Sequence, residues 1–554
     1  MAAMDEIRVE QNAAATKAPT VRADPKDCKP EHVNTLGSIQ LRHPVTNEII
    51  LIPTPSNDPN DPLNWSRGYR IYLAVISCAS IFLAQLLAAG PSVDMTRIIQ
   101  DIFGIMPTDP EFSSALSKIS YCFTGCAFVQ GMSNLVYMPL IIKYGRRPVY
   151  ILSFIVYGAC SLWAGLAKDY PSELAARLVL GFAGGSAECL APLTIADTFF
   201  LHERGLIMSY YSAALSSGVG GGIVLSGLIT INNSWRVIYY MATGLIWGLV
   251  ILITFTMPET AYKRTQSFDD QNHSVTDDDG TDTDKALAAH LEPRIPTKRT
   301  YRQQMRLFNP PLTDESLLTL FWRPIPLLFL PSVLWGTLSM SVVIGTFVAI
   351  SSNYATAFSN TYGFSTLQCG ATYSGVLVGA LVGIYGGGWL SDKVADLLTI
   401  RRGGIREPEM RLPTVTLSLV LSPLGLLLYG AGIAKAMHWI VPVVGLGCVG
   451  FVITQVSNIA IVYAVDAHRP IAGEVVVSEL SFKAAFGFLL SFYTNPWIES
   501  AGYINAFGAL AGISAAILVL WIPLYIWGKK IRVWSLGLRV LKGVHWGADR
   551  EVGE

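Results

Sequence analysis

Four ionisable residues stand inside long apolar stretches of the sequence, where a charge needs either a partner or a function. They are Arg177, Glu188, Glu479 and Lys483. A charged side chain inside a bilayer is costly, so such residues usually pair with one another or take part in binding and proton transfer. Carboxyl and ammonium groups can exchange protons and can bind solutes of opposite charge. These four residues are therefore the first candidates for a site.

Arg177 and Glu188 are eleven residues apart in one apolar stretch. On an α-helix this spacing returns to nearly the same face, about 16 Å further along the axis. Both side chains are therefore expected to face one central cavity. For Arg177 two interpretations stay open. It is either a proton relay or binding group for an anionic part of a solute, or a structural arginine bonded to neighbouring carbonyl groups.

Glu188 lies deeper in the same stretch, within Ser186-Ala187-Glu188-Cys189-Leu190. Desolvation favours the protonated form of a carboxyl group there, so that nearby charges can control its proton exchange. Glu188 is therefore the leading proton or cation site. The alternative is a permanently protonated glutamic acid that hydrogen-bonds another helix.

Glu479 and Lys483 are four residues apart, which places them on one helix face and predicts an internal ion pair. This pair is either structural or part of a substrate site. Amides in apolar stretches can hydrogen-bond a solute or another helix, and the helix contact is the favoured interpretation. The amides in question are Gln85, Gln130, Asn134, Gln455 and Asn458.

These residues must be positioned by membrane-spanning helices. The chain is 51% hydrophobic and only 14% charged, whereas a soluble protein has about 25% charged residues. A bilayer core of about 30 Å needs roughly 20 apolar residues per helix. Twelve stretches meet that demand, at 69–90, 120–142, 149–167, 172–199, 206–231, 238–257, 326–350, 367–390, 412–433, 438–465, 471–493 and 503–527. The fold class is therefore all-α integral membrane protein.

The twelve stretches fall into two groups of six, separated by polar sequence. The stretch from Tyr262 to Arg323 includes the run Asp277-Asp278-Asp279 and is expected to be disordered. The predicted organisation is a largely disordered N-terminal tail, a six-helix bundle, a central loop, a second six-helix bundle and a C-terminal tail, at 1–68, 69–257, 258–325, 326–527 and 528–554.

Positive charges in the short loops predict the orientation. With the N-terminus in the cytosol, ten Lys and Arg residues fall in cytosolic loops and five in the opposite loops. Because positive residues are concentrated on the cytosolic side, this count favours cytosolic termini and a cytosolic central loop. The first 68 residues do not have the pattern of a cleaved signal peptide.

Several function classes are disfavoured by composition. Lys plus Arg and Asp plus Glu each number 40, so charge does not predict a nucleic-acid partner. The eight cysteines are scattered, without the spacing of a disulfide framework or metal site. A phosphate-binding Gly-Lys-Ser/Thr loop is not found, and neither is a recognisable nucleophile set. The sequence therefore predicts no cofactor, no metal and no enzyme activity.

Similar charges recur at matching positions in the two halves, as related six-helix halves would leave behind. Asp197 precedes His202-Glu203-Arg204, and Asp466 precedes His468-Arg469. Loop charges of this kind are expected to hold one access state rather than to touch the solute. The gating candidates are Arg146, Arg147, Glu203, Arg204, Asp392, Lys393, Asp466 and Arg469.

These loops resemble the signature Gly-x-Leu-x-Asp-Arg-x-Gly-Arg-Arg of the major facilitator superfamily. The second half keeps Gly388, Leu390, Asp392 and Lys393, while the first half keeps only the end of the signature. Arg177-x-x-x-Gly181 resembles the intramembrane arginine motif of proton-coupled families. Further segments resemble fungal drug:proton antiporters and their multidrug, polyamine and secondary-metabolite relatives, namely 59–65, 258–260 and 403–412.

The resemblance implies two six-helix bundles around a central site that opens alternately to each side. It further implies a monomer in the fungal plasma membrane that exchanges protons for an amphipathic organic solute, drug, secondary metabolite or organic cation leaving the cytosol. The partners would be the lipid bilayer, a small organic solute and protons. Proton-coupled or facilitated uptake in the same fold is the alternative. A receptor that moves no solute and a membrane-embedded enzyme are further alternatives.

The orientation gives a direct prediction. A tag inserted in the central loop near Asp279 should react with an impermeant label only after the membrane is opened, because the positive loops place this segment in the cytosol. Labelling with and without permeabilisation measures this. Labelling of the tag in intact cells would reverse the predicted orientation.

Overall fold

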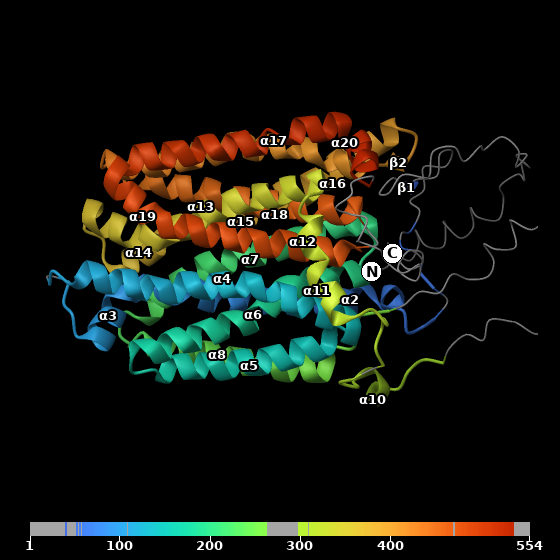
Figure 1. Ribbon diagram of the computed structural model, residues 1–554, viewed down its shortest axis with the longest axis horizontal. Coiled ribbons are helices and arrows are strands. Elements are labelled where there is room, and N and C mark those ends of the chain that lie inside the picture. The colour runs from blue at the N-terminus through green and yellow to red at the C-terminus, as the bar shows by residue number, and fades with distance from the viewer. Residues whose placement is uncertain are drawn as a thin grey trace, which may run out of the picture. The chain divides into compact units, whose positions relative to one another are not determined.

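Long helices dominate the computed structural model of the chain shown in Figure 1. The structure describes residues 39–40, 51, 53, 55–56, 58–107, 109–262, 297–308, 310–468 and 471–536. Helix is the expected form here, because in lipid every backbone N–H and C=O must be satisfied within the segment itself.

The first half contributes six long helical segments. The first combines α2, the 3-10 turn η2 and α3. Their bounds are η1 Pro62–Asn64, α2 Arg67–Ala89, η2 Gly90–Asp94, α3 Met95–Phe103, α4 Phe112–Tyr144, α5 Arg146–Leu166, α6 Tyr170–Thr198, α7 Leu201–Ile229 and α8 Arg236–Thr256.

The second half contains more interruptions. A π-helical segment, η4, lies between α15 and α16, and a 3-10 segment, η5, precedes α17. The bounds are α13 Pro331–Tyr362, α14 Thr366–Thr372, α15 Ser374–Ile384, η4 Tyr385–Trp389, α16 Leu390–Arg401, η5 Pro408–Thr414, α17 Val415–Ala434, α18 Ile440–Ala467, α19 Ala472–Leu518 and α20 Trp521–Leu536.

The predicted number of twelve membrane-spanning helices is confirmed. Eleven helices among the described residues are long and apolar enough to cross a membrane. The twelfth is the first part of α19, which carries Glu474, Glu479 and Lys483. Gly502, with φ 78° and ψ 161°, breaks α19 into two spans, because glycine adopts positive φ without steric cost. The last span runs on through α20 to Leu536, past its predicted end at Trp527.

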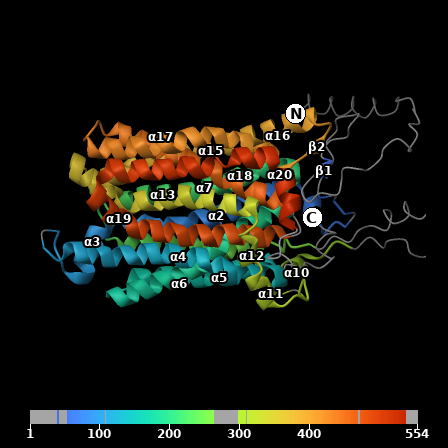
Figure 2. The ribbon, with the colours of Figure 1, turned by 45° about the horizontal axis from the view of Figure 1, so that its top comes forward.

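The long helices run side by side in both Figure 1 and Figure 2. In the first half α6 packs against α4 and α5, and α5 packs against α8. In the second half α13 packs against α19, and α17 and α15 pack against α18. The two halves meet where α19 contacts α4 and where α7 contacts α15 and α18. The cavity described below is lined by residues of α4, α7, α18 and α19.

The end of the helices at which α16 and the two strands lie, at the right of Figure 1, is called here the charged end. Asp392 lies in the first turn of α16, and Arg146 begins α5. The charged end is the end predicted to face the cytosol. Short elements gather there: α10 Tyr301–Gln304, α11 Leu317–Trp322 and α12 Pro324–Leu327. A two-residue strand pair joins β1 Ile39–Gln40 antiparallel to β2 Ile405–Arg406, with Ile39 opposite Arg406.

The expectation of disorder across 262–323 is wrong for the described residues from 297 onward. Leu320 is buried, and α11 packs against α4. Arg323 pairs with Glu315 at 3.0 Å and with Glu474 of α19 at 2.9 Å. These few apolar and charged contacts anchor the segment, although its composition is polar. The run at Asp277–Asp279 lies outside the described residues.

Close packing of α15 on α18 depends on glycine. A Cβ atom at Gly379 would lie 1.9 Å from the carbonyl oxygen of Gly447, whereas a Cβ at Gly244 of α8 would meet nothing within 4 Å. Substitution of either glycine by alanine favours the helix by up to about 1 kcal/mol. At Gly379 the overlap outweighs that gain, because forcing atoms into a packed contact costs about 1–3 kcal/mol.

Gly379→Ala should therefore lower the thermal unfolding midpoint of the purified protein, while the matched variant Gly244→Ala leaves it unchanged or slightly higher. Unfolding in detergent, followed by tryptophan fluorescence, measures both. Equal midpoints for the two variants would contradict the packing described here.

Candidate functional site

A cavity of about 120 Å³ lies between the two halves. Residues of α2, α4, α6 and α7 line one side, and residues of α13, α18 and α19 line the other. Most of the lining is apolar, including Phe123, Leu215, Ile344, Phe347 and Phe488. Its titratable side chains are Glu188 and Lys483. The cavity therefore offers an apolar surface with one charged pair.

Glu188 and Lys483 form an ion pair across the two halves. The Lys483 Nζ lies 3.4 Å from Glu188 Oε2, and both side chains are more than 90% buried. Three amides also donate to the carboxylate: Gln85 at 3.1 Å, Gln130 at 3.1 Å and Asn134 at 3.3 Å. Hydrogen bonds from amides and an ammonium group stabilise the charged form of a carboxylate. The structure thus brings five of the predicted site residues together.

Small residues permit this arrangement. A Cβ at Gly185 would lie 2.2 Å from the Gln130 carbonyl oxygen, so α6 and α4 approach closely enough for the amides of α4 to reach Glu188. A Cβ at Gly131 would lie 1.8 Å from the Cβ of Ala484, which brings α19 equally close to α4. Glycine and alanine are the residues that allow helix backbones to approach in a membrane.

The predicted ion pair between Glu479 and Lys483 is not present. Lys483 pairs with Glu188 instead, and neither carboxyl oxygen of Glu479 has a hydrogen-bond partner among the described residues. Glu479 occupies space that glycine leaves on α13, since a Cβ at Gly336 would lie 2.1 Å from Glu479 Oε1. The (i, i+4) spacing of Glu479 and Lys483 is compatible with an ion pair, but the Lys483 ammonium group binds the Glu188 carboxylate of the first half.

Arg177 does not share the cavity with Glu188. It is fully buried and bonds Glu173 at 3.3 Å and the Leu87 carbonyl oxygen at 2.8 Å. Its guanidinium group lies over the rings of Phe123 and Tyr239, at 4.3 and 5.1 Å from their centroids. Arg177 was expected to face the cavity with Glu188, but a local carboxylate and two aromatic rings hold its side chain about three turns from Glu188. These contacts agree with the structural interpretation of Arg177.

Gln455 and Asn458 bond backbone rather than the cavity. Gln455 donates to the carbonyl oxygens of Gly386 and Thr414, both at 3.2 Å. Asn458 donates to Gly387 at 2.6 Å and, across the two halves, to Gly205 at 3.3 Å. These contacts tie α18 to the glycine-rich π-helical segment η4 and to the end of η5.

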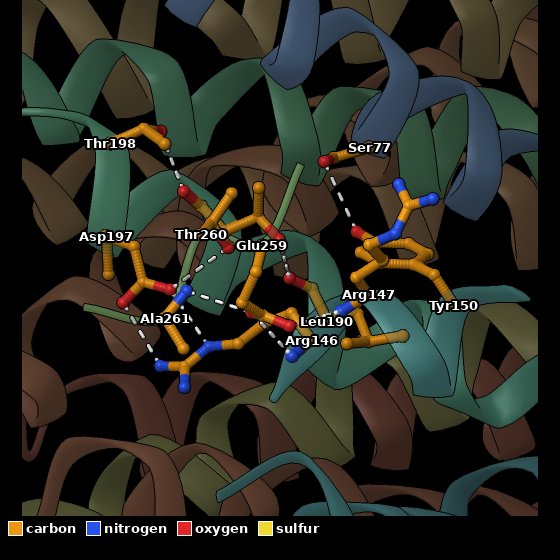
Figure 3. Close-up of polar contacts among 12 residues, drawn as sticks. Ser77, Arg146, Arg147, Tyr150, Leu190, Asp197, Thr198, Glu259, Thr260 and Ala261 are labelled. Carbon is orange, nitrogen blue, oxygen red and sulfur yellow. Dashed lines mark hydrogen bonds and ion pairs between the residues drawn. The ribbon is translucent and has the colours of Figure 1, made fainter. Parts of the chain in front are cut away.

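Figure 3 shows the charge cluster of the first half at the charged end. Arg146 binds Asp197 with two nitrogens, at 2.9 and 3.1 Å. Glu259 accepts the backbone N–H groups of Arg146 and Arg147 at 2.9 and 3.1 Å. The buried Arg147 guanidinium donates to the carbonyl oxygens of Thr254 and Met257. Glu259 therefore completes the start of α5, where helix N–H groups lack partners.

The second half has its own cluster at the charged end. Asp392 accepts from Arg411 and lies 3.7 Å from Arg406, and Arg411 lies 3.7 Å from Asp466. Burial and the neighbouring Arg411 lower the pKa of Arg406 to about 10. A Cβ at Gly205 of α7 would lie 2.1 Å from Asp392, so the cluster presses against the first half.

The other gating candidates have separate contacts. Glu203 pairs with Arg67 at 3.5 Å and with Arg70 at 3.9 Å. Arg204 donates to the carbonyl oxygens of Ala196 and Phe199. The Lys393 ammonium lies 4.0 Å from the Trp389 ring centroid. Arg469 lies outside the described residues.

Sequence reasoning missed several charged residues of these networks as site candidates, among them Arg411, Glu173 and Glu259. Arg411 was counted only as one loop arginine, and Glu259 was noted only in a motif. Glu173 stands four residues before Arg177, so the spacing rule for helical ion pairs could have identified it.

The fold and the cavity define a class of protein: a multi-pass membrane protein that carries small solutes between two helical halves. The model of the Major Facilitator Superfamily matches residues 74–476. The chain belongs to this superfamily, and its members are transporters rather than enzymes. Twelve helices in two halves are the fold of the superfamily.

Relatives in fungi are similar over most of their length. An uncharacterized MFS-type transporter of Schizosaccharomyces pombe is 25% identical, with 88% of this chain and 89% of the relative covered. The MFS transporter cpaT of Aspergillus oryzae is 26% identical, with 86% and 90% covered. Protein HOL1 of Saccharomyces cerevisiae is 24% identical, with 88% and 91% covered.

Solved structures show the same fold. The proton:xylose symporter XylE superposes with a TM-score of 0.57 at 16% identity, covering 84% of this chain and 96% of XylE. The human organic anion transporter MFSD10 superposes with a TM-score of 0.53 at 18% identity, covering 82% of this chain and all of that one.

The cluster around Asp392 generates a prediction about access states. Asp392→Asn removes the charge that Arg411 and Arg406 share, so the contact with α7 is expected to weaken and the populations of the access states to shift. Transport should slow severalfold while solute affinity stays within about twofold, because the cavity is untouched. Spectroscopic distances between labelled halves, together with binding and transport rates, measure this. Exposed Asp169→Asn is the control; loss of binding with unchanged distances would contradict the prediction.

Proposed function

We propose that this chain is a secondary active transporter that exports an amphipathic organic solute, drug, secondary metabolite or organic cation in exchange for protons. The observation that carries the proposal is the Glu188–Lys483 ion pair, which joins the two halves inside the shared cavity. A transporter of this fold works by alternating access, in which the two halves rock around a central site.

The lining of the cavity supports an amphipathic solute. Phe123, Phe347 and Phe488 offer apolar and aromatic surface to a hydrophobic body, and aromatic rings also attract organic cations. Glu188 offers a carboxylate to a positive group. One charged group among apolar residues is the usual composition of a small-molecule site, because the few polar groups set orientation.

The ion pair also supports coupling to protons. A cation that binds Glu188 must compete with the Lys483 ammonium group, so its arrival changes the charge around the carboxyl groups that this ammonium can reach. A nearby positive charge favours the ionised form of a carboxyl group, so binding of a cation can be coupled to release of a proton.

Direction and location are inferred from sequence resemblance. The segments at 59–65, 258–260 and 403–412 resemble fungal drug:proton antiporters, and the similar relatives reported above are fungal. They favour export from the cytosol by a monomer in the plasma membrane, with both termini in the cytosol. Proton-coupled or facilitated uptake in the same fold is the second candidate. It is favoured by the structural likeness to XylE, a proton symporter.

A solute library presented to proteoliposomes with an imposed pH gradient separates these functions. Accumulation against the proton flux indicates antiport, and accumulation along it indicates symport. Counterflow without dependence on pH indicates a facilitated carrier. Absence of counterflow for every solute would leave a receptor as the better interpretation and would contradict the proposed function.

Glu188→Gln tests the site. The variant keeps the side chain's size and an oxygen that can accept from Gln85 and Gln130, but it removes the charge, so Lys483 loses its partner. Accumulation driven by a pH gradient should be lost, while solute exchange at equal pH persists with weaker binding of cations. Exposed Glu111→Gln serves as the matched control. Undiminished gradient-driven accumulation by Glu188→Gln would show that Glu188 is structural.

A further inference from the structure

Glu479 is a buried carboxyl group whose environment differs from that of Glu188. Its exposed fraction is 0%, and both of its carboxyl oxygens lack a partner in the described part of the chain. It lies between α13 and α18: a Cβ at Gly336 would lie 2.1 Å from its Oε1 and 3.7 Å from the Ala460 Cβ. Lys483 stands one turn further along the same helix, with its ammonium group 3.4 Å from Glu188.

The two carboxyl groups are expected to differ in protonation. Glu188 accepts from three amides and the Lys483 ammonium, which together stabilise its charge. A charged Glu479 would be a buried anion without a hydrogen-bond donor, which is far more costly than the neutral acid. In this state Glu188 is therefore the charged partner of Lys483, and Glu479 is neutral and holds a proton.

The groups that face each carboxyl are few. Glu188 meets the three amides, Lys483 and the Tyr211 hydroxyl, which donates to the Glu188 backbone oxygen at 3.0 Å. Glu479 lies against Gly336 of α13 and near Ala460 of α18. Within one helical turn of these two residues, the titratable group in the described parts of α13 and α18 is Tyr463, whose ring packs edge-on against Trp335. Lys483 is thus the one cation within reach of both carboxyls among the described residues.

Building on the proposed function, we infer that Glu479 carries the exchangeable proton, and that a monovalent organic cation releases it by moving Lys483 from Glu188 to Glu479. The cation binds the Glu188 carboxylate. The displaced ammonium turns to the carboxyl four residues earlier on its own helix, a distance that a lysine side chain covers by changing rotamers. The O–H bond of Glu479 breaks, and its proton leaves to water on the side to which the cavity is open.

Charge balance fixes the stoichiometry. Before binding, the site holds charged Glu188, charged Lys483 and neutral Glu479, a net charge of zero. After binding, it holds the cation, charged Glu188, charged Lys483 and charged Glu479, again a net charge of zero. One proton therefore exchanges for one monovalent cation, and the loaded site carries no net charge in either form. A divalent cation would leave a positive charge in the cavity, which burial disfavours.

Glu479→Gln tests the inference with a side chain that has the shape of the protonated acid, so the fold is expected to persist. The probes are tetraethylammonium and benzyltrimethylammonium, permanent cations that carry no proton of their own. Titration calorimetry in two buffers with different heats of protonation counts the protons released. Wild-type protein should release about one proton per cation bound. The variant should release none, and should bind the probes at least tenfold more weakly with little pH dependence.

The double variant Glu479→Gln with Lys483→Met separates this role from a structural one. With the competing ammonium removed, Glu188 can take up a proton itself, so proton release on cation binding should return. Exposed Glu111→Gln is the control and should behave as wild type. In wild-type proteoliposomes, exchange of the probes for protons should move no net charge. A current of one charge per cation overturns the inference without requiring any variant to fold.

Failure of the inference can be distinguished from failure of the proposed function. If Glu479→Gln releases about one proton per cation, as the wild type is expected to do, the inference is overturned while coupled transport stands. Wild-type accumulation of neutral solutes under a pH gradient, without binding of either probe, does the same. Absence of gradient-driven transport of any solute contradicts the proposed function and the inference together.

Discussion

The ion pair between Glu188 and Lys483 is the contact on which the rest of the site depends. The first half buries the negative charge of Glu188 at the cavity, and the second half buries the positive charge of Lys483. Removing one partner of such a buried ion pair costs about 3–5 kcal/mol of folding stability. The surrounding sequence makes the contact possible. Small residues at Gly131, Gly185 and Ala484 bring three helices together, and amides of α2 and α4 supply the remaining donors. The cavity is therefore defined by two charges that neutralise one another only when the halves meet.

Sequence reasoning predicted the twelve spans and the polar residues of the site, but not all of its pairs. Spans follow from runs of apolar residues, which are local. The partner of Lys483 is 295 positions away, and helical periodicity carries no information about such a contact. The rule for (i, i+4) pairs therefore selected Glu479, which lies on the right helix. For Arg177 the expected place at the cavity was wrong, because Glu173, one turn further from Glu188, and two aromatic rings hold the guanidinium group.

At the charged end the two halves make comparable clusters from different residues. In the first half Ile142 stands where the family signature has Asp, and Glu259 instead accepts the N–H groups at the start of α5. In the second half Asp392 keeps the signature position and binds Arg411. Asp197 and Asp466 occupy equivalent places at the ends of α6 and α18 and bind Arg146 and Arg411 respectively. The two halves thus place carboxylates at the charged end by different means, Glu259 on backbone N–H groups and Asp392 on an arginine side chain.

The position of the ion pair along the helices explains how it can be coupled to access. Toward the charged end, Met138 packs so closely on α19 that a Cβ at Gly473 would lie 1.9 Å from its terminal carbon. Toward the opposite end, Val93 and Ile223 of the first half join the apolar cluster of the second half. Apolar contacts are not directional, so either set can separate as the halves rock. The ion pair lies between the two sets, and its geometry is specific. If the halves rock as proposed, opening on either side strains the same Glu188–Lys483 contact, and a ligand that replaced this contact would act on both sets of apolar contacts from one place.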